Sequence, residues 1–198
     1  MRLFVAIDID SAIAQRLGSF EDELRRRIAA QAPRARITWV PVQRLHLTVR
    51  FIGEVDEDRA AAIGRVLEAR LEAAPFELSI DHAGAFPERG RPRVLWAGIS
   101  HGIQGLQTLE REVSARLYSC GLAREERPYR PHLTLARVRD GSGLHSPQLF
   151  EGIASREFGT MSVDAITLFL SRPSSRGSEY VPFQRTRLTG AGDAFEGS

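Results

Sequence analysis

The feature that constrains the fold most is an internal repetition, because the order strand, amphipathic helix, strand occurs twice along the 198 residues. Residues 3–9 and 45–52 are apolar strand candidates with a helix between them, and residues 93–99 and 131–137 repeat this arrangement. In both helices the apolar residues recur every three or four positions, which marks one buried face. These positions are Ile13, Leu17, Phe20, Leu24 and Ile28 in the first helix and Leu106, Leu109, Val113 and Leu117 in the second. The pattern indicates an internal duplication.

Further helices and strands surround the two repeated units. A helix over residues 56–73 and a strand over residues 76–80 follow the first unit. The strands predicted after the second unit are residues 158–163, 165–170 and 180–188, with a loop at 172–178. Helices and hairpin-like neighbouring strands mixed in this order favour an α+β fold.

We therefore predict a single bilobal domain over residues 1–198, made of duplicated half-chains of roughly 1–90 and 91–188. The two lobes are expected to be pseudo-symmetric, each an antiparallel sheet with helices on its outer face, and to flank a central cleft. Residues 189–198 are rich in glycine and other small residues and are interpreted as a flexible tail.

The sequence has no lysine, so all 27 of its basic residues are arginine. Against 25 acidic residues they give a formal net charge of +2. Guanidinium groups stay protonated and bind phosphate through two parallel hydrogen bonds, so this small net charge is compatible with a local phosphate-binding surface. No apolar run is long enough to cross a bilayer, and the N-terminal run is shorter than a secretory signal. We expect a cytoplasmic protein that acts as a monomer, away from membranes.

Both repeated units carry the same triplet, histidine-leucine-threonine, in their second strand. Because side chains alternate along a strand, His46 and Thr48 share one face while their apolar neighbours share the other. The same parity places His132 and Thr134 together. If an approximate two-fold axis relates the two units, both histidines and both threonines surround one volume.

Such a group of side chains suits the hydrolysis of a phosphodiester. Imidazole titrates near neutrality, so one histidine can accept a proton from water while the other donates a proton to the leaving oxygen. Threonine hydroxyls can donate hydrogen bonds to the phosphate oxygens as they gain charge, and no metal is required. Two histidines with two threonines are a poor metal-ligand set, so we predict no metal site and no cofactor. His82, His101 and His145 fall in loops or at strand ends and are assigned no function.

With their flanking residues, the two triplets resemble the signature motifs of the 2H phosphoesterase superfamily. More closely, the chain is similar to the bacterial and archaeal RNA 2′,3′-cyclic phosphodiesterases, first named 2′-5′ RNA ligases. The similarity extends over most of the chain. The matching segments are residues 2–6, 39–41, 46–49, 51–54, 130–137 and 168–172.

The resemblance implies two α+β lobes around a V-shaped cleft, with His46 as the proton donor and His132 as the proton acceptor. Opening a terminal 2′,3′-cyclic phosphate in this way would leave a 2′-phosphomonoester. Thr48 and Thr134 would hold phosphate oxygens. Arg137 matches the arginine that ends the second motif and is implied as a further phosphate contact. Ideal strand parity, however, puts Arg137 on the opposite face from His132, so a bulge or the strand end must redirect it.

Residues around the motifs are candidates for contacts with RNA. Arg127 and Arg130 border the second motif, where they are placed to draw phosphates toward the cleft. Aromatic residues in such strands more commonly belong to the core, although they can also stack on bases. The aromatic candidates are Phe4, Trp39, Phe51 and Tyr129.

The expected partner is an RNA that ends in a 2′,3′-cyclic phosphate, tRNA fragments included, or a small cyclic nucleotide. Two alternatives stay open. The same site could perform reversible 2′-5′ RNA ligation, since a phosphodiesterase run backwards joins RNA. The chain could also be a non-catalytic RNA-binding module with a relict cleft, against which the intact pair of motifs argues.

Overall fold

The computed structural model describes residues 1–123, 125, 128–174 and 177–190. Its strands form one antiparallel sheet in the order β7-β4-β5-β6-β3-β1-β8-β9, and β2 pairs with β6 beside this path. The strands are β1 (Arg2–Asp8), β2 (Arg36–Trp39), β3 (His46–Glu54), β4 (Phe76–Phe86), β5 (Val94–His101), β6 (Leu133–Asp140), β7 (Glu157–Val163), β8 (Ala165–Ser174) and β9 (Gly177–Arg187). The helices are α1 (Ser11–Gln31), α2 (Glu57–Glu68), α3 (Ile103–Ser119) and the short α4 (Ser146–Leu149), with a 3-10 turn η1 at Val42–Arg44. The predicted α+β class is confirmed.

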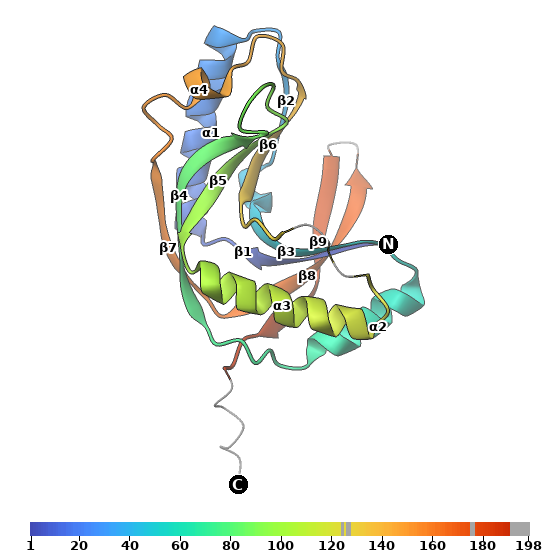
Figure 1. Ribbon diagram of the computed structural model, residues 1–198. Helices are drawn as coiled ribbons and strands as arrows, with labels where there is room; N and C mark the ends of the chain where they lie inside the picture. The colour runs from blue at the N-terminus through green and yellow to red at the C-terminus, as the bar shows by residue number, and fades with distance from the viewer. Residues whose placement is uncertain (124, 126–127, 175–176, 191–198) are drawn as a thin grey trace.

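The sheet is strongly curled and has two arms (Figure 1). The first arm consists of β3, β1, β8 and β9, and the second arm consists of β6, β5, β4, β7 and β2. The arms meet where β3 pairs with β6, through the register pair Leu47 and Leu133. The two lobes predicted from the sequence are therefore two arms of one continuous sheet.

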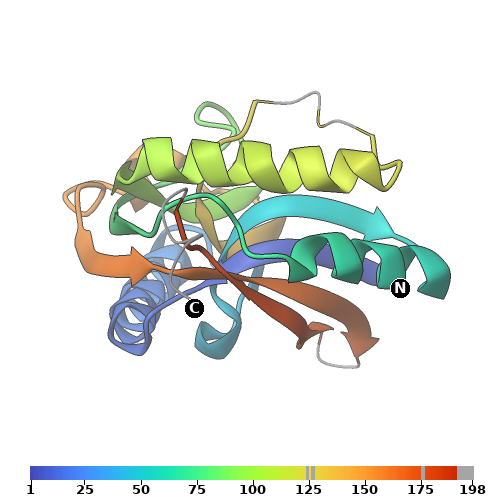
Figure 2. The ribbon, with the colours of Figure 1, turned by 90° about the horizontal axis from the view of Figure 1, so that it is seen from below.

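Each arm takes elements from both halves of the chain. β4 precedes β5 in the chain and pairs with it in the second arm, whereas β8 comes late in the chain and pairs with β1 in the first arm. The helices are exchanged as well, since α1 contacts β7 of the second arm and α3 contacts β3 of the first arm (Figures 1 and 2). Outward from the junction the strand order is β3, β1, β8 in one arm and β6, β5, β4 in the other. The matching strand order of the two arms agrees with a duplication. Neither arm is made of one half-chain alone, because β4, from the first half, lies in the second arm and β8, from the second half, lies in the first arm.

The helices bury the faces that their apolar spacing predicts. The core residues of α1 and α3 are Ile13, Leu17, Phe20, Leu24 and Ile28 in α1 and Leu106, Leu109, Val113 and Leu117 in α3. With alternate residues of the strands they form the main hydrophobic cluster. A second, small cluster of Phe4, Ala6 and Phe169 lies on the other face of the first arm, with Tyr180 packed against it. No described helix is both long and apolar enough to span a membrane.

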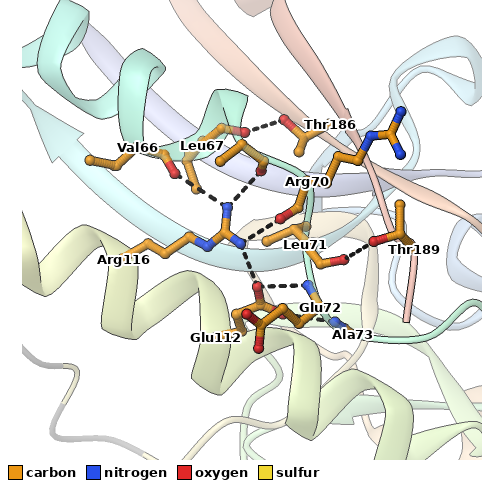
Figure 3. A network of polar contacts seen from close by, with 11 residues as sticks. Val66, Leu67, Arg70, Leu71, Glu72, Ala73, Glu112, Arg116, Thr186 and Thr189 are labelled. Atoms are coloured by element: carbon orange, nitrogen blue, oxygen red, sulfur yellow. Dashed lines mark hydrogen bonds and ion pairs between the residues drawn. The ribbon is translucent and has the colours of Figure 1, made fainter. Parts of the chain in front are cut away.

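The helix predicted over residues 56–73 is shorter in the structure, because α2 ends at Glu68. Two side chains of α3 bind the backbone that a longer helix would pair internally. Arg116 donates to the carbonyls of Val66, Ala69 and Arg70 at 3.4, 2.6 and 2.6 Å (Figure 3). Glu112 accepts hydrogen bonds from the amides of Glu72 and Ala73, at 2.9 Å each. Leu71 is still buried, but as a bridge partner of Leu188.

The loop predicted at residues 172–178 is wrong for the residues that the structure describes there. β8 continues to Ser174 and β9 begins at Gly177, so the segment is the end of a hairpin. Pro173 is compatible with this pairing because β8 beyond Ser171 has no register partner in β1 and pairs only with β9 among the described strands. Residues 191–198 of the predicted tail lie outside the described residues, while the amides of Thr189 and Gly190 bond to the carbonyls of Leu71 and Ala73.

Candidate active site

The two triplets meet at the junction of the arms. Their central leucines are register partners and are fully buried. Antiparallel pairing about these leucines brings His46 toward Thr134 and Thr48 toward His132, on the opposite face from the leucines. Diagonal neighbours in a regular sheet lie roughly 7–8 Å apart. The fold therefore directs both imidazoles to one face, diagonally across the junction.

A cavity of about 580 Å³ opens on this face. Four of the five predicted site residues, His46, Thr48, Thr134 and Arg137, line it. Arginines and aromatic residues of neighbouring strands complete much of the lining. These are Arg2, Arg44, Arg139, Phe4, Trp39, Phe51 and Tyr180. The cavity thus combines positive charge and aromatic surface around both threonines.

The fifth residue, His132, lies outside the lining of this cavity. It is half-buried, one residue before β6 begins, with its ring edge-on to Phe86 and 5.2 Å between the ring centroids. His46 packs in a similar way against rings of the first arm, at 4.9 Å from Phe4 and 5.1 Å from Tyr180. Aromatic rings of its own arm therefore hold each imidazole.

Both imidazoles are oriented by the same kind of hydrogen bond. His46 Nδ1 lies 2.8 Å from the carbonyl oxygen of Arg44, and His132 Nδ1 lies 2.8 Å from the carbonyl oxygen of Arg130. A carbonyl oxygen only accepts, so each Nδ1 carries the proton and donates it. In the neutral ring Nε2 is then the basic nitrogen, and in the charged ring it is a donor. Each histidine can therefore accept a proton at Nε2 when neutral and donate one from Nε2 when charged.

Burial lowers the pKa of both histidines from their ordinary value. For His46, desolvation is the main cause, opposed by the Arg44 carbonyl and by the negative charge of Asp8. For His132, desolvation again dominates and is opposed by the Arg130 carbonyl. The positive charge of Arg137 lowers the pKa of both histidines. Arg137 is thus within electrostatic reach of both rings, whereas Asp8 acts on His46.

The segment that leads to His132 is tied to β3. The hydroxyl of Tyr129 donates to the carbonyl of Thr48 at 3.0 Å. Arg50, which is 9% exposed, donates to the carbonyl of Ala123 at 2.7 Å. These bonds hold the second motif against the strand that carries the first.

β-Bulges explain how Arg137 reaches the cavity. In the pairing with β5, Thr134 and Ala136 face consecutive residues, so Leu135 is an extra residue. Leu135 and Ala136 are both buried, and the alternation resumes with Arg137 exposed on the cavity side. A bulge at the equivalent place in β3 leaves Phe51 as the counterpart of Arg137, 59% exposed and lining the same cavity.

The other candidates for contacts with RNA divide into two groups. Phe4, Trp39 and Phe51 line the cavity, and the guanidinium of Arg25 lies 4.2 Å from the centroid of the Trp39 ring. Tyr129, in contrast, packs against the core, and burial raises the pKa of its hydroxyl. Arg130 is exposed beside His132, and Arg127 lies outside the described residues.

Two titratable residues that the sequence interpretation left out belong to this face. Asp8 is the register partner of His46 and accepts a hydrogen bond from the Thr167 hydroxyl at 2.7 Å. His82 is not a loop residue but lies inside β4, with its ring 5.6 Å from that of Trp96. A bulge in the pairing of β4 with β5 sets its direction, which no pattern in the sequence indicates. In the part of the chain that the structure describes, no three His, Cys, Asp or Glu side chains form a group that could hold a metal.

Comparisons with known proteins agree with this architecture. An RNA 2′,3′-cyclic phosphodiesterase of Aeropyrum pernix is 34% identical over 151 residues, which cover 76% of this chain and 85% of the relative. A protein of the same name from Archaeoglobus fulgidus is 32% identical over 183 residues, which cover 91% of this chain and 96% of the relative. The crystal structure of Escherichia coli LigT complexed with 3′-AMP superposes with a TM-score of 0.73 at 28% identity, over 95% of this chain and 98% of LigT.

A family model also covers both triplets and the junction between them. It is described as the 2′-5′ RNA ligase superfamily, and it matches residues 16–172. Together with the curled antiparallel sheet and the relatives above, this match shows that the chain belongs to the 2′-5′ RNA ligase superfamily.

Proposed function

We propose that this protein is an RNA 2′,3′-cyclic phosphodiesterase that opens the terminal cyclic phosphate to a 2′-phosphomonoester. The observation that carries the proposal is the matched pair of imidazoles at the junction. Both donate from Nδ1 to a backbone carbonyl, and so both keep Nε2 for proton transfer. The names of the relatives support the substrate.

Each proton transfer has a group to perform it. His132 Nε2 takes a proton from a water molecule, whose oxygen attacks phosphorus in line with the 3′-oxygen. The bond from phosphorus to the 3′-oxygen breaks, and His46 Nε2 gives its proton to that oxygen. Thr48, Thr134 and Arg137 donate hydrogen bonds to the phosphate oxygens that gain charge. The phosphate charge itself favours the protonated form of His46 in the complex, against the effect of burial.

Asp8 supports the assignment of His46 as the acid. Its carboxylate raises the pKa of His46 and so favours the charged ring, which is the form that donates a proton. The position equivalent to Asp8 in the second arm is Gly98, which follows Ala97, the register partner of Leu133, just as Asp8 follows Ile7, the register partner of Leu47. His132 lacks this neighbouring charge and is suited to the role of base.

Product analysis tests the proposal. A short oligoribonucleotide ending in a 2′,3′-cyclic phosphate is incubated with the protein, and the terminal phosphate of the product is located by NMR. We expect a 2′-phosphate and a rate that a chelator leaves unchanged. A 3′-phosphate would reverse the roles of the two histidines. RNA binding without any turnover would instead favour the non-catalytic module.

Reversible 2′-5′ ligation is a second candidate, favoured by the description of the family. The same groups serve it if a 5′-hydroxyl takes the place of water. Mixing RNA ends that carry a cyclic phosphate and a 5′-hydroxyl, and measuring the joined and hydrolysed products at equilibrium, separates the two reactions.

A further inference from the structure

A row of aromatic rings leads away from His132 over the second arm. The ring centroids of His132 and Phe86 lie 5.2 Å apart, those of Phe86 and Trp96 5.1 Å, and those of Trp96 and His82 5.6 Å. We call Phe86, Trp96 and His82 the ring row. All three are only partly buried, and among the described residues Phe86 and Trp96 do not pack against either hydrophobic cluster. The core therefore does not account for the ring row.

Glycines bring two of these rings close to the backbone of the sheet. A Cβ atom on Gly84 would lie 2.6 Å from Cζ2 of Trp96, and one on Gly98 would lie 2.0 Å from Nε2 of His82. Any side chain at these positions would displace the rings. Glycine in a strand often marks such a close approach, and here it leaves the rings lying over the strands.

His82 is held firmly although its side chain is 44% exposed. Its Nδ1 donates to a carboxylate oxygen of Asp81 at 2.6 Å, and the hydroxyl of Ser100 donates to the other oxygen. The residue lies in a bulge and has a φ of 41°, in the left-handed region. Strained backbone of this kind clusters at functional sites. Because the Ser100 hydroxyl is bonded to the carboxylate and not to the imidazole, His82 is not placed to activate Ser100 as a nucleophile.

The ring row is matched only in part in the first arm. Phe86 corresponds to Phe169, because they pair with Val94 and Phe4, which in turn face Arg137 and its counterpart Phe51. In the same register Trp96 corresponds to Ala6. The duplicated fold therefore does not require a large ring at Trp96, and among the described residues this ring is particular to the arm that supplies His132.

The place of the ring row beside His132 relates it to the nucleophile. In an in-line displacement at phosphorus, the attacking and leaving oxygens lie on opposite sides. With His132 as the base and His46 as the acid, the nucleophile enters from the side of His132 and of the ring row. The ribose oxygen that leaves is on the other side, toward the first arm.

We infer that the ring row binds the bases of a second RNA strand, whose 5′-hydroxyl replaces water as the nucleophile. The inference rests on the proposed function. His132 takes the proton of the 5′-hydroxyl, the 5′-oxygen bonds to phosphorus, the bond to the 3′-oxygen breaks, and His46 protonates that oxygen. The product is a 2′-5′ phosphodiester beside a free 3′-hydroxyl, and no further reactant is consumed.

The charges on this surface favour bases over phosphates as the bound groups. Asp81 places a carboxylate beside His82, which disfavours a phosphate at that point of the ring row. Base stacking on aromatic rings is uncharged and tolerates any sequence. The acceptor strand is therefore expected to bind with little sequence preference.

A competition between joining and hydrolysis tests the inference. The donor is a short oligoribonucleotide with a terminal 2′,3′-cyclic phosphate, and the acceptor is one with a free 5′-hydroxyl. The measured quantity is the ratio of joined to hydrolysed donor at limiting acceptor. We expect Trp96→Ala to lower this ratio about 10-fold, as for the loss of one base stack, and Trp96→Phe to restore most of it.

Two further variants complete the test. His82→Gly removes the ring and suits the left-handed backbone, so it should lower the ratio without a folding defect. His101→Ala removes an exposed histidine at the end of β5 and is the matched control, with an unchanged ratio.

Three results would overturn the inference. They are hydrolysis of the donor with no joining at any acceptor concentration, an unchanged ratio in Trp96→Ala and His82→Gly, and an equal fall of both reactions in these variants. The last would assign the ring row to the donor strand or to the position of His132. In all three the unmodified protein still hydrolyses the donor, which distinguishes them from failure of the proposed function, where no donor is consumed.

Discussion

The two arms present the same triplet in different surroundings. In the first arm His46 lies among Phe4, Phe169 and Tyr180, with ring centroids 4.9, 6.4 and 5.1 Å away, and Asp8 is its register partner. In the second arm Phe86 packs against His132, and Gly98, which follows the register partner of Leu133, stands at the position equivalent to Asp8. The repeated fold gives both imidazoles the same Nδ1 hydrogen bond to a backbone carbonyl. Their different neighbours are the reason for proposing His46 as the acid and His132 as the base.

The largest expected effect is the loss of either imidazole. His46→Ala and His132→Ala should each lower kcat/KM for a cyclic-phosphate oligonucleotide by at least about 10²-fold, the usual loss for a general acid or base. Steady-state kinetics of the purified variants measure this, with His101→Ala as the control. Near-normal turnover in either variant would show that the histidine replaced in it is not the general acid or base.

Arg137 should affect both arms alike. Arg137→Ala removes a charged hydrogen bond to the phosphate, and we expect kcat/KM to fall about 10- to 100-fold. It also removes a positive charge that lowers the pKa of both histidines, so both limbs of the pH profile of kcat/KM should move to higher pH. Arg137→Lys keeps the charge and should leave the limbs in place. A shift of one limb alone would mean that Arg137 acts on the pKa of only one of the two histidines.

The two outer helices offer a comparison of stability. Glu21 of α1 is 2% exposed, and burial raises its pKa to about 7, against the opposing effect of Arg25. The unfolded chain loses this proton near 4.5, so the folded state becomes less stable as pH rises from there to about 7. The loss should amount to about 3 kcal/mol, which Glu21→Gln should abolish. Denaturant unfolding at several pH values measures it.

The control for this prediction lies in the equivalent helix. Glu110 of α3 stands at the corresponding place in the apolar pattern, but it is only half-buried and accepts a hydrogen bond from Ser114 at 2.6 Å. Glu110→Gln should leave the pH dependence of unfolding as it is. Equal effects of the two substitutions would locate its origin elsewhere than in Glu21.

The smallest expected effect separates the two histidines. Asp8→Asn removes a charge that raises the pKa of His46, so His46 should lose its proton at lower pH. The basic limb of kcat/KM, which requires the protonated acid, should move to lower pH by a fraction of a unit, and the acidic limb should stay. Movement of the acidic limb instead would exchange the assigned roles.

Local patterns predicted most of the helices and strands and several of the residues that line the cavity. Apolar spacing identified the buried faces of α1 and α3, and strand parity predicted that His46 and Thr48 share a face, as they do in lining the cavity. These features depend on residues near one another in the chain, which is why the sequence indicates them.

Features that depend on a partner strand could not be predicted in this way. Arg137 reaches the cavity because β5 leaves Leu135 without a partner, and the ring of His82 contacts that of Trp96 because of a bulge between β4 and β5. α2 ends at Glu68, where Arg116, from a helix far along the chain, binds the carbonyls of Ala69 and Arg70 that follow it. The exchange of β4 and β8 between the arms likewise follows from pairings at long range.

The pairing of β3 with β6 is the narrowest connection between the two arms of the sheet. Among the described strands it is the shortest pairing between neighbours in the sheet, a single residue pair, and the reacting groups stand directly beside it. A change in how far the sheet bends at this pairing would therefore change the distance between His46 and His132, the proposed acid and base. Under the proposed mechanism, substitutions on α1 and α3, which contact β7 and β3, are expected to lower kcat more than they raise KM.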